Sequence, residues 1–335
     1  MLRDRFSGPG KGGRIMTGVI CGTGACVPER ILDNNEIAEF VDTSDQWIRE
    51  RTGVEQRRIA REETTVSMAA ETGRQAVEEA GISPEDIDMI ITATATPDQI
   101  FPCTACEVQK ELGAVRAVCF DMNAACSGFL FAYQTAQAYI ASGICRNILI
   151  TGSERLSGIV DWKDRGTCIL FGDGAGAALI RAKEGKQYLP FACSDGTGGP
   201  ALTCPGYAGK QDGDQKVISH ISMDGREVFQ FAVRRVPEAV REVLKKNDLK
   251  TEDIDWFVLH QANQRIVEAA AKRLKTEIEK FPMNLQKYGN TSSASIPILL
   301  NELNRSGKLK KGQKLILAGF GAGLSWGASV LEWGI

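Results

Sequence analysis

Cys126 lies in the segment DMNAACSGF (Asp121 to Phe129), where an apolar run gives way to small residues and then to helical spacing. The pattern predicts a buried strand before the cysteine and a helix after it. Unpaired N–H groups at the start of that helix favour a thiolate, the reactive form of cysteine. Because Ala124, Ala125 and Gly128 leave room for a ligand beside the sulfur, we expect a nucleophile rather than an inert core cysteine.

Two further side chains have the chemistry that such a nucleophile needs. His260 follows the apolar run WFVL and precedes polar residues, which is typical of an imidazole at the end of a strand. Asn290 precedes an apolar helical segment, where it is either the N-cap of that helix or an amide donor in a site. A neutral imidazole and a neutral amide stabilise an enolate or an oxyanion by hydrogen bonding. The glycine-rich run 319–323 has two interpretations: it either places the backbone N–H of Ala322 in the site as a hydrogen-bond donor, or it forms a tight bulge between strands.

A faint internal repeat brings these residues together. With an offset of 167 residues, three segments of the first half match three of the second: Ala76–Ile82 with Val243–Leu249, Ser83–Ala95 with Lys250–Ala262, and Arg146–Gly152 with Gln313–Gly319. The same offset superposes Cys126 on Ser293 and Asn123 on Asn290. Since functional groups collect at the carboxyl ends of strands in α/β folds, we expect Cys126, His260 and Asn290 to converge on one cleft.

The repeat predicts a duplicated α/β chain with two pseudo-symmetric halves, residues 16–185 and 186–335. Short, continuous apolar strands that alternate with helices favour mostly parallel sheets covered by helices on both faces. The first half has an additional stretch, Arg155–Leu170. Residues 1–15 are basic and rich in glycine, and we expect a disordered N-terminal extension, with Met16 as a possible biological start.

Composition excludes several classes of function. The 40 Lys and Arg against 42 Asp and Glu leave a net charge of −2, which gives no electrostatic basis for nucleic-acid binding. No apolar run is long enough to span a membrane, so we expect a cytoplasmic protein. Apart from Cys126, we interpret the ten cysteines as reduced core thiols, including the CxxC pair Cys103 and Cys106. With two histidines in the chain, we expect neither a metal nor a cofactor.

With these residues assembled, the chain closely resembles the β-ketoacyl-acyl-carrier-protein synthase III family of the thiolase superfamily, over Thr17–Ile335. Six motifs carry the resemblance: SDQWIRERTGV (Ser44–Val54), NAACSGF around Cys126, DRGTCILFGDGAGA (Asp164–Ala177), HQANQRI (His260–Ile266), GNTSSASIP (Gly289–Pro297) and GFGAGLSWG (Gly319–Gly327). The resemblance implies a five-layered αβαβα thiolase fold, two halves related by duplication, and a homodimer.

The family's reaction is a decarboxylative condensation that initiates fatty acid synthesis. The resemblance implies that Cys126 takes the acyl group of a short acyl-CoA, such as acetyl-CoA, which is a substrate and not a cofactor. Malonyl-acyl carrier protein then loses CO2 while His260 and Asn290 hold its thioester oxygen, and the enolate attacks the acyl group. The backbone amides of Cys126 and Ala322 form the oxyanion hole.

The resemblance also assigns binding residues. Trp47, Arg51 and Arg165 contact the adenine and phosphates of CoA, an assignment that suits the stacking of indole and guanidinium groups on a base. Three residues line the pantetheine tunnel: Thr43, Ala262 and Asn263. Phe101 reaches across the dimer to limit the acyl pocket. Three basic residues on one helical face dock the acidic carrier protein: Arg265, Lys272 and Arg273. Gln230 and Arg226 differ from the residues that some members of the family have at these two positions.

Three other functions fit parts of the pattern. The order of Cys126, His260 and Asn290 is also that of papain-like cysteine proteases, although no CGSCW-type motif surrounds Cys126. A condensing enzyme of secondary metabolism has the same three catalytic residues. A non-enzymatic scaffold that binds acyl-CoA predicts binding without a covalent adduct. The residues alone leave the preferred acyl chain open.

Overall fold

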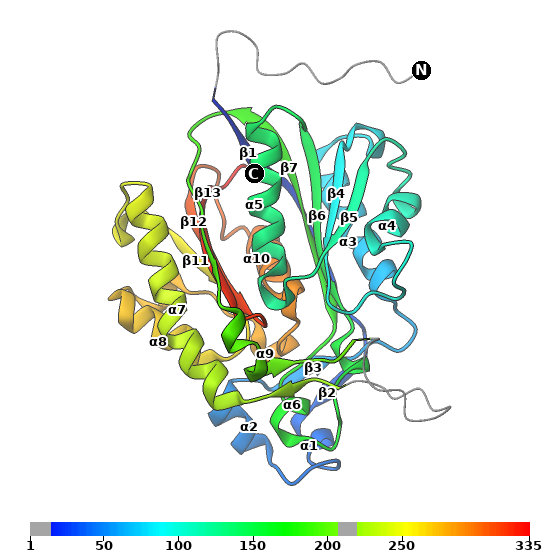
Figure 1. Cartoon of the computed structure of the whole chain (residues 1–335), viewed down its shortest axis with the longest axis vertical. Helices are drawn as coiled ribbons and strands as arrows, with labels where there is room; N and C mark the ends of the chain where they lie inside the picture. The colour runs from blue at the N-terminus through cyan, green and yellow to red at the C-terminus, as the bar shows by residue number, and fades with distance from the viewer. Residues whose placement is uncertain (1–14, 207–219) are drawn as a thin grey trace.

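The chain folds around two β-sheets, each built from a different part of the sequence (Figure 1). The structure is a computed structural model and describes residues 15–206 and 220–335; the expected disordered extension lies outside these residues except for Ile15. Across the first sheet the strands follow the order β1 (Met16–Cys26), β7 (Gly174–Glu184), β6 (Asn147–Glu154), β4 (Met89–Ala93) and β5 (Val118–Met122). Across the second the order is β8 (Phe191–Ser194), β13 (Ser325–Glu332), β12 (Lys314–Gly321) and β11 (Trp256–Leu259).

Both sheets mix parallel and antiparallel strands, so the expectation of mostly parallel sheets is wrong. The strand β4 pairs in parallel with β5 and β6, and β11 pairs in parallel with β12. The strands β7 and β13 are antiparallel to both of their neighbours. A strand covered by helices on both faces is a continuous apolar run whichever direction it takes, so its composition did not reveal the direction.

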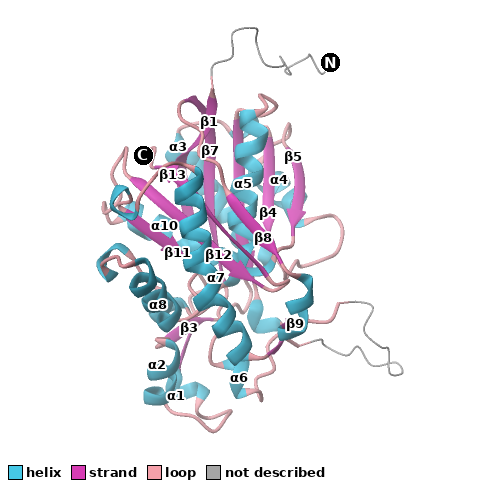
Figure 2. Ribbon diagram, turned by 60° about the vertical axis from the view of Figure 1, so that its left-hand side comes forward, coloured by secondary structure: helices cyan, strands magenta, loops and turns pink. Residues whose placement is uncertain are grey.

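Helices cover the sheets in a five-layered αβαβα arrangement (Figure 2). The outer face of the first sheet packs against α3 (Thr65–Ala80) and α4 (Thr104–Leu112). Between the sheets lie α5 (Gly128–Ala141) and α10 (Ser295–Arg305). On the far side of the second sheet lie α7 (Gly225–Lys246) and α8 (Gln264–Leu274).

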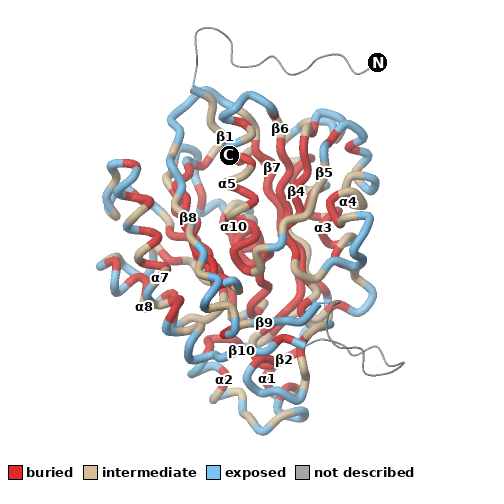
Figure 3. Tube along the Cα trace, in the orientation of Figure 1, coloured by how far each residue is buried: buried red, intermediate tan, exposed pale blue. Residues whose placement is uncertain are grey.

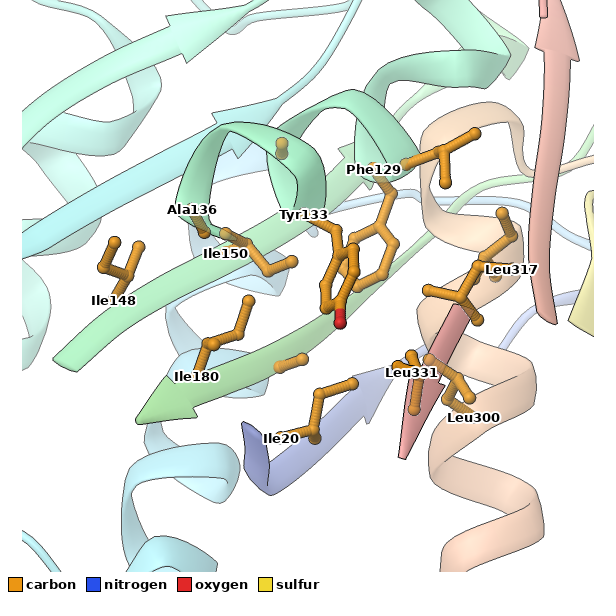
Figure 4. Packing of buried hydrophobic residues seen from close by; sticks show 14 of the residues in the cluster. Ile20, Phe129, Tyr133, Ala136, Ile148, Ile150, Ile180, Leu300, Leu317 and Leu331 are labelled. Atoms are coloured by element: carbon orange, nitrogen blue, oxygen red, sulfur yellow. The ribbon is translucent and has the colours of Figure 1, made fainter. Parts of the chain in front are cut away.

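The helix α5 packs on both sheets, which explains why its apolar residues are not confined to one stripe. Phe129 and Tyr133 of α5 contact Ile150 and Ile180 of the first sheet and Leu317 of the second in one buried cluster (Figure 4). In the burial map of Figure 3, α10 is largely red, whereas α5 is a mixture of red and tan. A helix between two sheets must be apolar on opposite sides.

A smaller set of elements gathers at one end of the two sheets (Figure 1). It contains the pair β2 (Ile31–Asp33) and β3 (Gln56–Arg58), the pair β9 (Leu202–Thr203) and β10 (Ser222–Met223), and four short helices: α1 (Asn34–Ile37), α2 (Asp45–Thr52), α6 (Arg165–Cys168) and α9 (Leu285–Tyr288). Residues of the additional stretch 155–170 form part of this end.

The offset of 167 residues recurs in the backbone. The turn η2 (Ala125–Ser127) leads into α5, and the turn η7 (Ser292–Ala294) leads into α10, each 167 positions further on. Ala125 and Ser292, which also correspond, have the unusual positive φ angles of 45° and 49°. The match is interrupted at β5, because the residues that correspond to this strand form the helix α9. We call η2 and η7, each with the two residues before it and the first turn of the helix that follows, the first and second elbows; they begin at Asn123 and Asn290.

None of the helices in residues 15–206 and 220–335 is long and apolar enough to cross a membrane.

The second elbow packs directly on the backbone of β6, which generates a prediction about stability. A Cβ atom added at Gly152 lies 2.4 Å from the carbonyl oxygen of Ser293, whereas one added at Gly158 meets no atom within 4 Å. We expect Gly152→Ala to lower the free energy of unfolding by about 1–3 kcal/mol through overpacking. Gly158→Ala is the matched control and should change it by less than about 1 kcal/mol. Equal midpoints of chemical unfolding for the two variants would contradict the contact.

Candidate active site

The sequence places Cys126 in the first elbow, between β5 and α5. The preceding residue, Ala125, has a φ of 45°, a conformation that costs free energy for a residue with a Cβ atom. Its N–H donates a hydrogen bond to the Asn123 side-chain oxygen, at 3.3 Å, which supports the turn. Cys126 itself is 8% exposed. The strand-to-helix position expected for this residue is therefore present.

The end of β12 lies against the first elbow and brings the second half of the chain to the nucleophile. A Cβ atom added at Gly321 lies 2.8 Å from the Cys126 backbone nitrogen, so only glycine fits there. Ala322 follows in the turn between β12 and β13, next to this contact. The glycines of 319–323 thus end a strand and open a turn. The role of the Ala322 amide as an oxyanion donor stays a prediction.

His260 follows β11 and extends its pairing with β12, because its backbone N–H donates to the Ala318 carbonyl oxygen at 2.9 Å. Its ring packs edge-on against Phe320, the residue next to Gly321, with 5.1 Å between ring centres. The side chain is 2% exposed. Since Gly321 contacts Cys126, two neighbouring residues of β12 hold the histidine and the cysteine in one region.

Ser295 orients the His260 ring, and the sequence patterns did not reveal it. The distance between His260 Nδ1 and Ser295 Oγ is 2.6 Å, while Nε2 is buried without a hydrogen-bond partner among the described residues. The backbone N–H of Gln261 points to the same Ser295 oxygen at 3.4 Å. If the Ser295 hydroxyl donates to Nδ1, the imidazole proton is on Nε2 and can be donated to a substrate oxygen.

Asn290 is fixed by its backbone and by its own side-chain oxygen. Its N–H donates to the Leu170 carbonyl oxygen at 2.8 Å, and its carbonyl oxygen accepts from the Gly172 N–H at 3.0 Å. Its Oδ1 accepts from the Ser292 N–H at 2.9 Å. The N-cap of α10 is Ala294, so the alternative of Asn290 as the N-cap of that helix is wrong. With its oxygen occupied, the Asn290 amide can offer its N–H groups to a ligand.

The two elbows meet in the interior of the molecule. A Cβ atom added at Gly128 in the first elbow lies 2.9 Å from Ala93 Cβ and 3.4 Å from Ser293 Cβ in the second elbow. The candidate site is therefore formed by the first elbow, the ends of β11 and β12, and the second elbow. Cys126, His260 and Asn290 all belong to these segments, as the repeat predicts.

Burial controls the protonation of the site. Desolvation raises the pKa of the Cys126 thiol to about 12, and it lowers the pKa of His260 to about 3. The expectation that the helix start makes Cys126 a thiolate is thus wrong for the free protein. The cost of burying the charged sulfur exceeds the stabilisation from the helix end, which is about 2 kcal/mol at most. The cysteine and the histidine are both neutral at pH 7.

Three of the residues assigned to CoA lie together at the end formed by α2 and α6. The Arg51 and Arg165 guanidinium carbons lie 5.7 and 4.9 Å from the centre of the Trp47 indole ring. Arg165 also donates to the Asp42 carbonyl oxygen at 2.9 Å. One aromatic ring with two cations is a suitable surface for a base that carries phosphates.

The residues assigned to the pantetheine tunnel include one with a structural function. Asn263 is the N-cap of α8, accepting from the Arg265 N–H at 2.9 Å, and its Nδ2 donates to the Arg51 carbonyl oxygen at 3.0 Å. It therefore connects α8 with α2, the helix that contains Trp47 and Arg51. The Thr43 hydroxyl is buried without a hydrogen-bond partner among the described residues, and Ala262 is half-buried.

Four assigned residues lie on the surface of this chain. Phe101 is 82% exposed, just before α4. Arg265, Lys272 and Arg273 are exposed on α8, and Arg265 lies over the ring of Phe229 from α7 at 5.0 Å. None of these four side chains is buried within the chain.

The burial of the cysteines differs from the expectation that all except Cys126 are core thiols. None of the ten forms a disulfide, but only Cys145 and Cys168 are buried besides Cys126, and Cys204 is exposed. The interpretation of all nine as core thiols is therefore wrong. Apolar neighbours in the sequence did not distinguish a strand face that points inward from one that points outward. In the described parts of the chain, no three His, Cys, Asp or Glu residues are arranged to hold a metal ion.

Comparisons with known proteins agree with this arrangement. Residues 120–196 match the family described as 3-oxoacyl-[acyl-carrier-protein (ACP)] synthase III, and residues 244–333 match its C-terminal part. The chain is similar to β-ketoacyl-[acyl-carrier-protein] synthase III of Clostridium acetobutylicum, with 49% identity over 94% of this chain and 98% of the relative.

Two solved structures are also similar to the chain. The 3-oxoacyl-[acyl-carrier-protein] synthase III of Aquifex aeolicus superposes with a TM-score of 0.89 at 44% identity, covering 94% of this chain and 100% of the other. The priming β-ketosynthase of the R1128 polyketide biosynthetic pathway superposes with a TM-score of 0.91 at 35% identity, covering 95% and 96%.

The raised pKa of Cys126 predicts how its alkylation depends on pH. Because only the thiolate reacts, the rate with iodoacetamide should rise about tenfold per pH unit from pH 7 to 10, without a plateau. Mass spectrometry of the peptide that contains Cys126 measures this rate separately from the other thiols, and Cys126→Ala identifies the peptide signal. A plateau below pH 8 would contradict the neutral thiol.

Proposed function

Because the chain belongs to the 3-oxoacyl-[acyl-carrier-protein] synthase III family, it is an acyltransferase that catalyses the initiating condensation of fatty acid synthesis, and we propose that this condensation proceeds through an acyl group on Cys126. The single observation that supports the proposal most strongly is the meeting of the two elbows. The first elbow supplies the thiol, and the second supplies Asn290 and Ser295, whose hydroxyl lies 2.6 Å from Nδ1 of the strand-end His260.

The first half-reaction transfers a short acyl group, for which we propose acetyl from acetyl-CoA. The Cys126 sulfur forms a bond to the thioester carbon, the bond from that carbon to the CoA sulfur breaks, and the thiol proton leaves with CoA. The backbone amides of Cys126 and Ala322 hold the tetrahedral oxyanion. The close contact of Gly321 with the Cys126 nitrogen supports this geometry.

The second half-reaction uses malonyl-acyl carrier protein. The bond between the malonyl carboxylate and its carbon breaks to release CO2, and the electron pair forms an enolate that attacks the acyl-Cys126 carbonyl. The tetrahedral intermediate then releases the Cys126 sulfur, which takes up a proton. His260 and Asn290 donate hydrogen bonds to the enolate oxygen. A histidine kept neutral by burial, with Nε2 unpartnered, suits a hydrogen-bond donor and not a cation.

We assign substrate binding to the groups around α2 and α8. Trp47, Arg51 and Arg165 contact the nucleotide of CoA, and the stacking of both arginines on the indole supports this. Thr43, Ala262 and Asn263 line the path of the pantetheine. Three exposed cations of α8 dock the acidic carrier protein: Arg265, Lys272 and Arg273. CoA thioesters are substrates, and the reaction requires no cofactor.

We also propose that the enzyme is a homodimer formed through β5. This strand is at the edge of the first sheet, where its backbone groups are open to pairing with another strand. Apolar residues near it are exposed, with Val115 at 72%, Val118 at 58% and Phe101 at 82%. A partner subunit would cover this patch and receive Phe101 as the end of its acyl pocket. Ten cysteines without a disulfide support a reducing, cytoplasmic location.

Specific observations distinguish the proposed condensation from the alternative functions. A papain-like protease uses a thiolate beside an imidazolium, whereas burial makes both groups neutral here. A condensing enzyme of secondary metabolism is the second candidate, because the priming β-ketosynthase of a polyketide pathway has the same fold at 35% identity. A faster reaction with malonyl-CoA, or with a carrier protein of a polyketide pathway, than with the fatty acid carrier would favour that candidate.

The proposal is tested by acyl labelling. The protein is incubated with an equimolar mixture of acetyl-, butyryl- and isobutyryl-CoA, and the adduct is mapped by mass spectrometry. We expect acetyl on Cys126, no adduct on Cys126→Ala, and normal labelling of Cys204→Ala, a control at an exposed thiol. An adduct on another residue, or none, would contradict the acyl-enzyme, and a branched adduct would correct the primer.

The two half-reactions predict a division of labour between residues. We expect His260→Ala to acylate within about threefold of the normal rate but to condense about a hundredfold more slowly, because the enolate loses a donor. Release of 14CO2 from labelled malonyl carrier protein measures the second step. The control is His220→Ala, which removes the other, exposed histidine. Near-normal release from His260→Ala would show that this division is wrong.

A further inference from the structure

Arg57 is a buried cation to which neither half-reaction assigns a role. It lies in β3, at the end of the molecule where α6 and α9 also lie (Figure 1), and it is fully buried. None of the ion pairs in residues 15–206 and 220–335 includes it. A buried charge costs free energy unless hydrogen bonds satisfy it, so the partners of Arg57 indicate what it does.

The Arg57 guanidinium joins three separate segments of the chain. Its Nη1 donates to the Leu32 carbonyl oxygen at 3.2 Å and to Asn34 Oδ1 at 2.9 Å. Its Nη2 donates to the Ile169 carbonyl oxygen at 2.6 Å. Leu32 belongs to β2, Asn34 begins α1, and Ile169 directly follows α6. Because the donors of a guanidinium lie in one rigid plane, these bonds fix the three segments relative to one another.

Asn34 is a firm anchor for one end of the guanidinium. Its side chain is buried, and its Nδ2 donates to Asp45 Oδ1 and to the Val54 carbonyl oxygen, both at 2.9 Å. Its Oδ1 is therefore oriented towards Arg57 and cannot exchange places with the amide nitrogen without losing these bonds. Asp45 is the first residue of α2, so Arg57 is held from the side of that helix and reaches from there to Ile169.

Ile169 leads directly into the segment that holds Asn290. The Leu170 carbonyl oxygen accepts from the Asn290 N–H at 2.8 Å, and the Gly172 N–H donates to the Asn290 carbonyl oxygen at 3.0 Å. Phe171 and Asn290 thus form a parallel bridge that belongs to none of the named strands. Since no sheet holds this bridge, the position of Asn290 depends on what fixes residues 169–172.

The stem of Arg57 also packs against both sides of this bridge. A Cβ atom added at Gly172 lies 3.0 Å from Arg57 Cβ, and one added at Gly289 lies 3.3 Å from it. The Gly289 position also leaves no room beside the Leu170 carbonyl oxygen, which is 2.5 Å from the added atom. Arg57 therefore contacts the chain on each side of Asn290 and bonds to the residue that precedes its partner segment.

We propose that Arg57 is a positioning residue of the condensation, whose guanidinium fixes residues 169–172 and thereby holds the Asn290 amide where the enolate oxygen forms. It acts through Asn290 and touches no substrate. The planar guanidinium reaches oxygens of three segments at once, whereas the single ammonium of a lysine cannot donate in the same directions. This inference rests on the proposed role of Asn290 as a donor to the enolate.

Release of 14CO2 from labelled malonyl carrier protein by the acetylated enzyme tests the proposal. Arg57→Lys keeps the charge but loses the planar donors. We expect its kcat for CO2 release to fall about tenfold while KM for malonyl carrier protein stays within about twofold, because a displaced Asn290 weakens an interaction that forms in the transition state. At saturating acetyl-CoA the acylation rate of Cys126 should stay within about threefold, because Asn290 takes no part in that step.

A double variant and a matched control separate positioning from general damage. Asn290→Ala should slow CO2 release about a hundredfold through the lost donor. Adding Arg57→Lys to this background should slow it by less than about twofold more, because Arg57 acts through the missing amide. The control is Arg58→Lys in the same strand, because the Arg58 side chain bonds to the carbonyl oxygens of Pro28 and Glu29 instead. It should leave CO2 release within about twofold of normal.

Three results would overturn the proposal. Normal CO2 release by Arg57→Lys would mean that the planar donors are not needed, and an equal loss in both half-reactions would mean that the substitution damages the whole site. A full additional loss in the Asn290→Ala background would mean that Arg57 does not act through Asn290. If Arg57→Lys does not fold, Arg57→Gln, which removes the buried charge and keeps an amide donor, allows the same comparisons. Failure of the proposed function is distinct, because the normal chain itself would then show no acetyl on Cys126 or no CO2 release.

Discussion

The backbone contact between Gly321 of β12 and the amide nitrogen of Cys126 determines where the other groups of the site must lie. A Cβ atom at Gly321 would be 2.8 Å from that nitrogen, so the strand and the elbow approach as closely as backbones can. The next residue along β12, Phe320, supports the His260 ring, and the parallel neighbour β11 ends at His260. A reciprocal contact, Gly152 against Ser293, holds the second elbow and with it Asn290. Two glycines thus connect the halves of the chain at the candidate active site.

Burial is the second constraint, and it sets the charge state of the site. It keeps the Cys126 thiol and the His260 ring neutral. A neutral site suits a reaction whose charges develop only in the transition states, as an enolate and as tetrahedral oxyanions. Hydrogen-bond donors that carry no charge stabilise these species without fixing an ion beforehand. The same burial explains why the helix start at α5 is insufficient to generate a thiolate in the free protein.

The sequence predicted the main groups because they obey local rules. A strand end, small residues and a helix start identify Cys126, and the offset of 167 residues then indicates the second elbow with Asn290. The sequence did not reveal the role of Ser295, because its contact with His260 joins residues that are 35 positions apart in the chain. The direction of the strands could not be predicted either, because buried parallel and buried antiparallel strands have the same apolar composition. The raised pKa of Cys126 could not be predicted, because it depends on how deeply the folded chain buries the sulfur, and no short segment of sequence determines that burial.

Above all, we propose that one acyl group on Cys126 is passed directly to the carbon that malonyl carrier protein provides. A single-turnover chase tests this most directly: the acyl-enzyme is formed, freed of acyl-CoA, mixed with malonyl carrier protein, and sampled by mass spectrometry alongside the CO2 released. The account predicts that the acyl mass leaves Cys126 at the rate at which CO2 and the 3-oxoacyl product form. Product formation while the acyl mass stays on Cys126 would contradict it.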